Sequence, residues 1–156
     1  YGKSTGDLTE QKLYDWAMVF YKLARAHYSK DSIILYGRSL GTGVASQLAA
    51  VRDCKALLLE APYYSLPALA AGFAPIYPVN QMVKNKLPNW KYLQEVTAPV
   101  TIFHGTDDDL IPFSHSKRLL PYLKKGDELV SLEGGGHNNS YQSEEYKHKL
   151  DSILQH

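Results

Sequence analysis

The sequence predicts an α/β fold, with a mostly parallel β-sheet and helices on both of its faces. Two observations favour this fold class. Short, continuous apolar runs are typical of strands that are buried on both faces of a parallel sheet. Segments with helical periodicity alternate with these runs, as in βαβ units. The four expected strands are residues 32–36, 56–60, 100–104 and 128–132.

Helices are expected between and around these strands. The first begins after Thr9, a good N-cap residue that is followed by the acidic Glu10, and runs to about residue 28. Its apolar residues recur at helical spacing, so they are predicted to form one buried face on which His27 is packed. They are Leu13, Trp16, Ala17, Phe20, Leu23, Ala24 and His27. The other expected helices are residues 42–50, 114–123 and 143–154.

The composition is that of a single globular domain. The 156 residues are 44% hydrophobic and 21% charged, with a net charge of +1. The scattered Lys and Arg residues argue against a nucleic-acid partner, which needs a clustered basic surface. Cys54 is the sole cysteine, so no internal disulfide forms. No apolar run approaches the roughly 20 residues of a membrane span, and the compartment stays open between a soluble cytoplasmic and a membrane-anchored domain.

The segment from Pro62 to Pro99 departs from the strand–helix alternation. It is rich in aromatic residues, and prolines prevent it from forming one long helix. We expect a small lid or insertion, over about residues 62–98, above the carboxyl edge of the sheet, where ligands bind in such folds. The alternative is an ordinary crossover with an irregular helix. The predicted substrate-pocket residues are Tyr63, Tyr64, Phe73, Tyr77 and Trp90.

A Gly-x-Ser-x-Gly pattern, Gly37–Gly41, lies between the first expected strand and the helix after it. In a nucleophile elbow of this kind the turn strains the serine backbone, and both glycines are expected where neighbouring backbones approach closely. The turn exposes the Ser39 hydroxyl, and backbone N–H groups beside it can bind a developing negative charge. The alternative is a Gly-rich turn with an idle serine.

Candidate partners for Ser39 follow two later strands. His137 follows three glycines after the last strand, and Asp107, Asp108 and Asp109 follow the third strand. Because parallel strands bring such loops to one edge of a sheet, these groups can form a Ser-His-Asp triad in the chain order serine, acid, histidine.

The residues alone leave alternatives open. They do not decide which of the three aspartates is the acid, and a solvated loop is the alternative for His137. A metal site formed by the aspartates with His104 is a rival reading, although the run lacks the alternating ligands of a calcium loop. His104 is otherwise expected to be packed or to support the site, and the weaker candidates are His115, His148 and His156.

These segments resemble the α/β hydrolase superfamily, and within it the BEM46-like and ABHD17-like serine hydrolases. The resemblance covers nearly the whole chain. It rests on residues 1–4, 36–43, 60–66, 104–112 and 136–138. It implies that the acid is the fifth position of a His-Gly-x-x-Asp-x-x-Ile/Val-Pro pattern, which is Asp108. It also implies that His137 is the base and that the Leu40 N–H is one donor of the oxyanion hole.

The resemblance further implies that residues 1–156 are the C-terminal part of one α/β-hydrolase domain of roughly 250 residues, the upper end of ordinary domain sizes. On this reading the chain supplies the last four strands of an eight-stranded sheet. The expected partner is the N-terminal half of the same fold, with a loop that supplies the second oxyanion donor. Without it, the strand at residues 32–36 is expected to be an open edge that is prone to association.

The expected activity is hydrolysis of carboxylic esters through an acyl-enzyme, without a cofactor. The alternatives are an acyl-protein thioesterase or a serine peptidase with the same triad, and a non-catalytic binding module. The ABHD17-like relatives imply depalmitoylation, but that type depends on a cysteine-rich N-terminal segment that this sequence does not contain. Membrane association through a preceding segment is also left open. The Gly-rich turn lacks the dinucleotide fingerprint and a Walker lysine.

Overall fold

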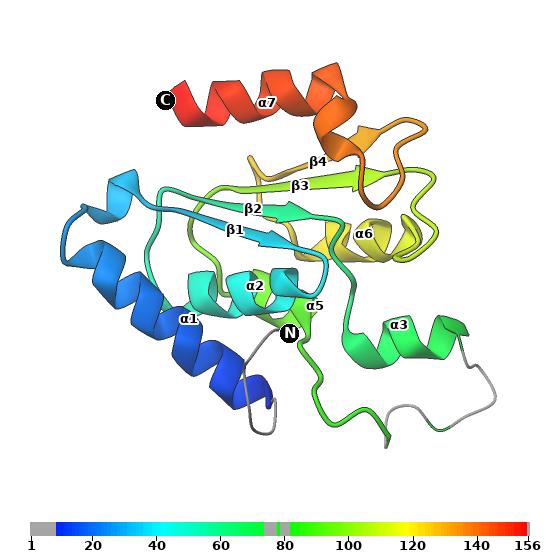
Figure 1. The fold of residues 1–156 in the computed structure, drawn as a ribbon, viewed down its shortest axis with the longest axis horizontal. Helices are drawn as coiled ribbons and strands as arrows, with labels where there is room; N and C mark the ends of the chain where they lie inside the picture. The colour runs from blue at the N-terminus through cyan, green and yellow to red at the C-terminus, as the bar shows by residue number, and fades with distance from the viewer. Residues whose placement is uncertain (1–8, 74–77, 79–81, 156) are drawn as a thin grey trace.

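The computed structural model describes residues 9–73, 78 and 82–155. Its centre is a four-stranded, wholly parallel sheet in the order β1-β2-β3-β4 (Figure 1). The predicted α/β class with a parallel sheet is confirmed. The strands are β1 (Ile34–Arg38), β2 (Ala56–Glu60), β3 (Val100–Gly105) and β4 (Glu128–Leu132).

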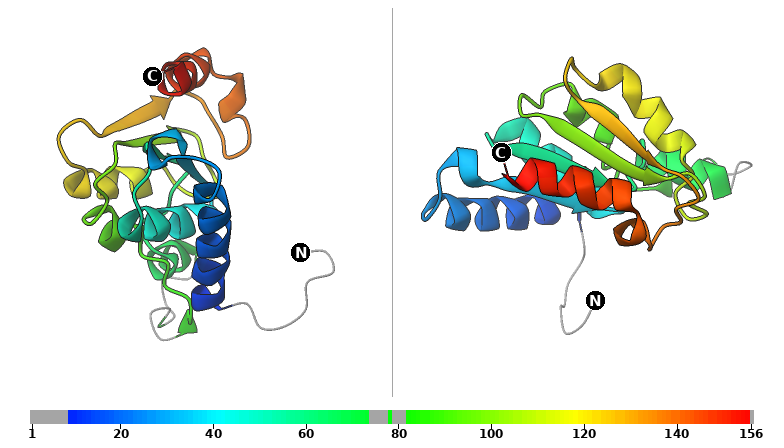
Figure 2. Two further views of the ribbon diagram at one scale, coloured as in Figure 1. Left: turned by 90° about the vertical axis from the view of Figure 1, so that its left-hand side faces the viewer. Right: turned by 90° about the horizontal axis from the view of Figure 1, so that it is seen from above.

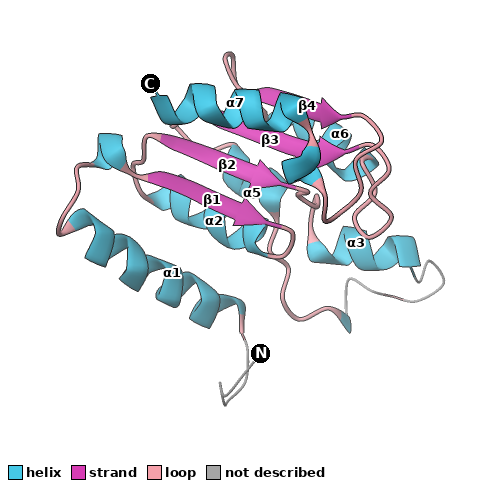
Figure 3. Cartoon of the chain, turned by 45° about the horizontal axis from the view of Figure 1, so that its top comes forward, coloured by secondary structure: helices cyan, strands magenta, loops and turns pink. Residues whose placement is uncertain are grey.

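The carboxyl ends of all four strands lie at the same edge of the sheet, perpendicular to the strands. Arg38 pairs with Glu60, Glu60 pairs with Phe103, and Phe103 pairs with Val130. The loops that follow β1, β3 and β4 therefore emerge beside one another (Figure 3). This edge is the place where a parallel α/β sheet assembles a site from separate loops.

Helices cover both faces of the sheet, as predicted (Figures 1 and 2). On one face lie α1 (Glu10–Arg25), α2 (Gly41–Val51), α5 (Asn89–Leu93) and α6 (Ser114–Leu119), and on the other lies α7 (Glu144–Gln155). Short 3₁₀ turns are Lys30–Ser32, Leu120–Tyr122 and Ser140–Gln142. Within the described ranges, no helix is both long and apolar enough to cross a membrane.

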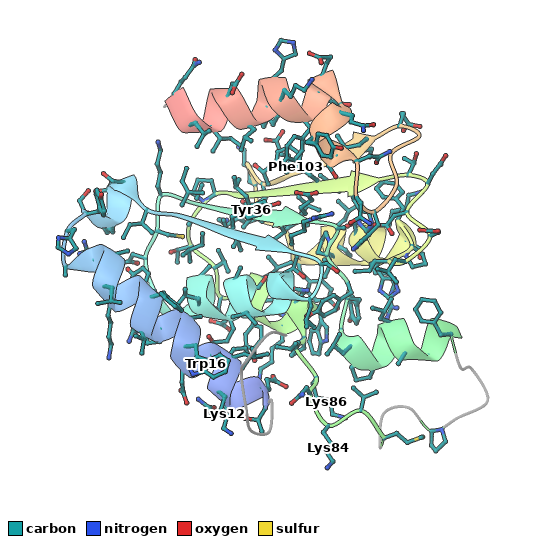
Figure 4. The ribbon with its side chains drawn as sticks, in the orientation of Figure 1. Lys12, Trp16, Tyr36, Lys84, Lys86 and Phe103 are labelled. Carbon is teal, nitrogen blue, oxygen red and sulfur yellow. The ribbon has the colours of Figure 1, made fainter. Side chains whose placement is uncertain are left out.

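The main core lies between the sheet and the helices α2, α5 and α6. Leu57, Leu59 and Ile102 have no exposed surface there, and they pack against Ala45 and Leu119. On the other face Phe103 stacks edge-on against Tyr146 of α7, with ring centroids 4.7 Å apart. Figure 4 shows Phe103 and Tyr36 on this α7 side of the sheet. Apolar burial on both faces accounts for the continuous apolar runs in β2 and β3.

Helix α1 begins as predicted, but the face that it buries is only partly the predicted one, since Ala17 and Ala24 pack against the core. The Thr9 hydroxyl accepts a hydrogen bond from the Lys12 N–H at 3.3 Å, and the helix ends at Arg25, three residues earlier than expected. Its buried residues are Tyr14 and Tyr21, whereas much of the predicted apolar face is exposed in the described part of the chain. The prediction of a packed His27 is also wrong, because that residue is exposed. The large apolar residues exposed on this helix are Trp16, Val19, Phe20 and Leu23.

Other element boundaries also differ from the predictions, and two of these differences have a visible local cause. Strand β1 begins at Ile34 rather than at residue 32, because a 3₁₀ turn continues to Ser32 and Ile33 N–H still donates to Lys30. The helix expected over residues 114–123 ends at Leu119, and a 3₁₀ turn follows that contains Pro121 in its first positions. Proline lacks the N–H that would continue the α-helix.

The segment expected to form a lid divides into two parts. Helix α3 (Leu66–Phe73) lies beyond the carboxyl ends of the strands (Figures 1 and 3). By contrast, the buried Asn89 at the start of α5 donates hydrogen bonds to Tyr63 O at 2.8 Å and Thr42 Oγ1 at 3.1 Å, which ties α5 to α2. The boundaries 62–98 of the lid stay a prediction, since residues 74–77 and 79–81 lie outside the described part.

Candidate active site

Ser39 stands in a strained turn between β1 and α2. Its φ of 50° lies in the left-handed region, which costs a residue with a Cβ about 1–3 kcal/mol. The turn is held from both sides, because Ser39 N–H donates to Glu60 O at 2.9 Å and Thr42 N–H donates to Ser39 O at 3.0 Å. Gly37 permits the packing of α2, since a Cβ there would lie 2.7 Å from Ala45 Cβ.

The expected crowding at Gly41 is not found. Among the described residues, nothing lies within 4 Å of a Cβ built at Gly41. The prediction of close approach therefore holds for Gly37 and is wrong for Gly41 within this part of the chain. Gly41 lies instead on the lining of an open hollow between α1, β1 and α2.

The Leu40 N–H lies at the amino end of α2, directly after Ser39. No described residue accepts a hydrogen bond from it, so it is available to a negatively charged group beside the Ser39 hydroxyl. Its orientation is fixed through Ser39 O, which belongs to the same planar peptide group and accepts a hydrogen bond from the Thr42 hydroxyl at 2.7 Å. The Tyr63 hydroxyl donates to the next carbonyl, Leu40 O, at 3.1 Å.

His137 lies between Ser39 and Asp108. Its Nε2 is 3.1 Å from Ser39 Oγ, and its Nδ1 is 2.7 Å from Asp108 Oδ2. Both His137 and Asp108 are at least nine-tenths buried. The structure therefore brings together the serine, histidine and acid that the resemblance singled out.

Glycines let the His137 loop approach the end of β3. A Cβ at Gly105 would overlap the main-chain carbonyl group of Gly135. Asp107 N–H donates to Gly135 O at 2.9 Å, and Gly134 adopts a φ of 67°. Gly135 thus has a steric reason and Gly134 a conformational one, whereas a Cβ at Gly136 would make only ordinary contacts, the nearest at 3.8 Å.

The three neighbouring aspartates have different surroundings. Asp107 and Asp109 are exposed, whereas Asp108 is buried. Asp108 Oδ1 accepts hydrogen bonds from Leu110 N–H at 3.0 Å and Ile111 N–H at 2.8 Å, which leaves Oδ2 directed at His137. Asp108 therefore differs from Asp107 and Asp109 in two ways: it is buried, and it accepts two backbone hydrogen bonds.

His104 is packed behind the aspartate, in keeping with the expectation of a packed or supporting residue. It has no exposed surface, and burial lowers its pKa below the usual value, which favours a neutral imidazole. Its Nε2 is 2.8 Å from Ile111 O, a pure acceptor, so we assign the proton to Nε2. Nδ1 then accepts from the Ser116 hydroxyl at 2.6 Å, and Nε2–H also lies 3.3 Å from Asp108 Oδ2.

The rival metal site finds no support in the residues described. In those parts of the chain, no group of three His, Cys, Asp or Glu side chains is arranged to hold a metal ion. Asp108 is turned toward His137 and the backbone, while Asp107 and Asp109 are exposed.

The predicted pocket residues differ in position. Tyr63 has no exposed surface, so it supports Leu40 from behind and does not line an open pocket, which corrects that expectation. Tyr64 stacks on Trp90 with ring centroids 5.9 Å apart, and its hydroxyl lies 3.0 Å from that of Tyr122. Phe73 is 64% exposed on α3. Tyr77 lies outside the described residues.

Sequence reasoning missed two residues beside the site. Arg38 and Glu60 lie in segments that carry the resemblance, residues 36–43 and 60–66, but the sequence assigns neither of them a role in the site. In the structure Arg38 donates to His137 O at 2.9 Å, and its Nε lies 3.3 Å from Glu60 Oε1. The available signal was the acidic residue that ends the otherwise apolar run 56–60.

The buried histidines predict a loss of stability in acid. Burial lowers the pKa of His104 and of His115 below the value of about 6.5 that histidine has in an unfolded chain, so the unfolded chain binds more protons. This stability contribution is complete above about pH 6.5 and is lost as the pH falls below that value. We expect the free energy of unfolding, measured by urea titration, to decline less steeply with acid in His104→Gln than in the wild type.

His148→Gln, on the exposed surface of α7, is the matched control for this substitution. An equally steep acid decline in His104→Gln and in His148→Gln would contradict the assignment of a neutral, buried His104.

Comparison with known proteins places the chain in a family. A family model described as "Alpha/beta hydrolase domain" matches residues 7–156. Alpha/beta hydrolase domain-containing protein 17C of Mus musculus is 31% identical over 160 residues, which cover 100% of this chain and 48% of that protein. Protein 17B of Homo sapiens is 31% identical over 158 residues, covering 99% and 53%. The chain spans about half the length of the curated relatives it matches.

Solved structures show the same fold at lower identity. An esterase from Pyrococcus furiosus superposes with a TM-score of 0.71 at 18% identity, covering 99% of this chain and 66% of that one. A monoacylglycerol lipase from Paleococcus ferrophilus has a TM-score of 0.67 at 17% identity, covering 99% and 80%. The expected resemblance and the expected fold are both confirmed, and the chain belongs to the α/β hydrolase family.

Proposed function

We propose that this chain carries the catalytic residues of a serine hydrolase that cleaves carboxylic esters. The observation that carries the proposal is the hydrogen-bonded series from Ser39 Oγ to His137 Nε2, at 3.1 Å, and from His137 Nδ1 to Asp108 Oδ2, at 2.7 Å. A serine hydroxyl is a weak nucleophile until a base removes its proton, and a carboxylate that holds the far side of the imidazole makes histidine that base.

In the proposed mechanism the proton moves from the Ser39 hydroxyl to His137. Because Asp108 accepts from Nδ1–H, the Nε2 lone pair of His137 faces the Ser39 hydroxyl. As Ser39 Oγ attacks the ester carbonyl, His137 takes its proton, and the Leu40 N–H stabilises the negative charge on the carbonyl oxygen. His137 then protonates the departing alcohol, and a water molecule activated by the same imidazole hydrolyses the acyl-Ser39 ester.

We infer a preference for an uncharged, hydrophobic acyl group. Apolar surface is exposed close in sequence to the proposed nucleophile and acid, since Leu40 and Leu110 are 41% and 50% exposed. Two of the structural neighbours are an esterase and a monoacylglycerol lipase. Another neighbour is an acylaminoacyl peptidase, so the ranking of esters before acyl thioesters and peptides is part of the proposal.

The proposal includes a partner segment from the N-terminal half of the same fold. Strand β1 is an edge of the described sheet, and Tyr36 on it is 50% exposed. Beside it lies a hollow of about 480 Å³ whose lining includes Phe20, Ile34 and Leu48. A preceding strand paired with β1 would cover this apolar surface, and the loop after it would supply the second oxyanion donor. Membrane association through such a segment stays a prediction.

Substrate hydrolysis tests the proposal. The natural full-length protein is incubated with matched p-nitrophenyl esters, acyl thioesters and peptide amides of an uncharged acyl group, beside Ser39→Ala. We expect turnover of the ester to exceed that of the other two, and Ser39→Ala to lose it. Full turnover by Ser39→Ala would reject Ser39 as the nucleophile, and thioester turnover above ester turnover would move the substrate class to acyl thioesters.

The three aspartates provide a matched series for the proposed acid. Asp108→Asn keeps the shape of the side chain but no longer fixes the productive tautomer of His137, so kcat for the ester falls by about 10⁴-fold. Asp107→Asn and Asp109→Asn change exposed carboxylates and leave kcat nearly unchanged. Equal losses in all three variants would contradict the assignment of Asp108.

A further inference from the structure

Glu60 is a buried carboxylate at the carboxyl end of β2. It is 5% exposed, and burial of an ionised carboxylate is costly unless donors surround it. Among the described residues, three side chains bind it: the Tyr36 hydroxyl donates to Oε2, the Tyr146 hydroxyl donates to Oε2 at 3.3 Å, and Arg38 Nε lies 3.3 Å from Oε1. Burial is the larger cause and the contact with Glu60 the smaller cause of a raised pKa for Tyr36 and for Tyr146, so both phenols stay protonated and donate.

Arg38 reaches from this carboxylate to the loop of the proposed base. While Nε faces Glu60, Nη2 donates to His137 O at 2.9 Å and to Asn138 Oδ1 at 2.6 Å. Both acceptors belong to the loop that follows β4. A planar guanidinium can serve acceptors on several sides at once, which a lysine ammonium at the end of a flexible chain does less well.

The serine turn and the His137 loop follow strands that lie on opposite sides of the sheet. Ser39 follows β1 and His137 follows β4, and these strands are the first and last in the described order. Two further strands separate them, so pairing within the sheet does not by itself bring the Ser39 turn and the His137 loop together. The Gly134–Gly136 run that precedes His137 has no side chains to pack. Arg38, directly before Ser39, is a side chain that joins the serine turn to the main chain of His137.

We propose that Glu60 and Arg38 form a clamp that holds the His137 loop at the serine turn, so that Nε2 stays within reach of Ser39 Oγ. Glu60 orients the guanidinium, and the guanidinium binds the main-chain carbonyl of His137 and the side chain of Asn138. Arg38 is therefore a positioning residue that contacts neither the substrate nor the reacting atoms. The effect on catalysis rests on the proposed function, whereas the effect on the loop does not.

Substitution of Arg38 tests the clamp in the natural full-length protein. In Arg38→Met the His137 loop loses its hydrogen bonds to the serine turn. We expect kcat for the ester to fall by about 10- to 100-fold while KM changes by less than about twofold. The reason is that a small displacement of the base affects chemistry rather than binding. Arg38→Lys keeps the charge but not the planar guanidinium that binds Glu60 and the His137 loop together, so we expect its kcat to stay below that of the wild type. Arg52→Met is the matched control, because Arg52 lies at the far end of α2 and donates to Val51 O.

Amide hydrogen exchange over residues 134–139 gives a readout that needs no activity. We expect faster exchange in Arg38→Met than in the wild type and in Arg52→Met. If the wild type hydrolyses no ester but the exchange difference is present, the clamp stands and the proposed function fails. Unchanged exchange, full activity in Arg38→Lys, or a loss confined to KM would each overturn the clamp.

Discussion

Parallel pairing of the four strands is the constraint on which the rest of the structure depends. Because all strands run in one direction with the register that pairs Arg38, Glu60, Phe103 and Val130 across the sheet, their loops emerge at one edge. The proposed nucleophile, acid and base follow three different strands, and this common end of the sheet allows their loops to come within hydrogen-bonding distance. Burial of the central strands on both faces fixes the edge rigidly.

Close backbone approaches then determine where each group lies. At one end of the site, Gly37 lets α2 pack against β1 and the strained Ser39 turn is held by Glu60 O and by Thr42. At the other end, the contact between Gly105 and Gly135 brings the aspartate and histidine loops together. The strain at Ser39 persists because its neighbours hold it in place, as is typical of functional turns.

The sequence predicted the local features of this arrangement better than the non-local ones. Strands β2 and β4 have the predicted boundaries, because their apolar runs and the flanking turns are local signals. The face of α1 was predicted only in part, because Trp16 and Phe20 fit a helical stripe but are 52% and 71% exposed among the described residues. Residue chemistry alone left three aspartates open, and the resemblance selected Asp108. The contacts of Arg38 with the His137 loop join residues 99 positions apart, and no local pattern reports them.

The central claim is that Ser39 is an activated nucleophile held by His137 and Asp108. Its most direct test is peptide mass mapping of the natural full-length protein after reaction with a fluorophosphonate. This probe phosphonylates an activated serine, and the reaction needs an assembled nucleophile, base and oxyanion donor. The account predicts a single adduct on the peptide that carries Ser39. A folded protein that acquires no adduct, or that carries the adduct on another residue, would contradict the account and favour a non-catalytic binding role for this hydrolase fold.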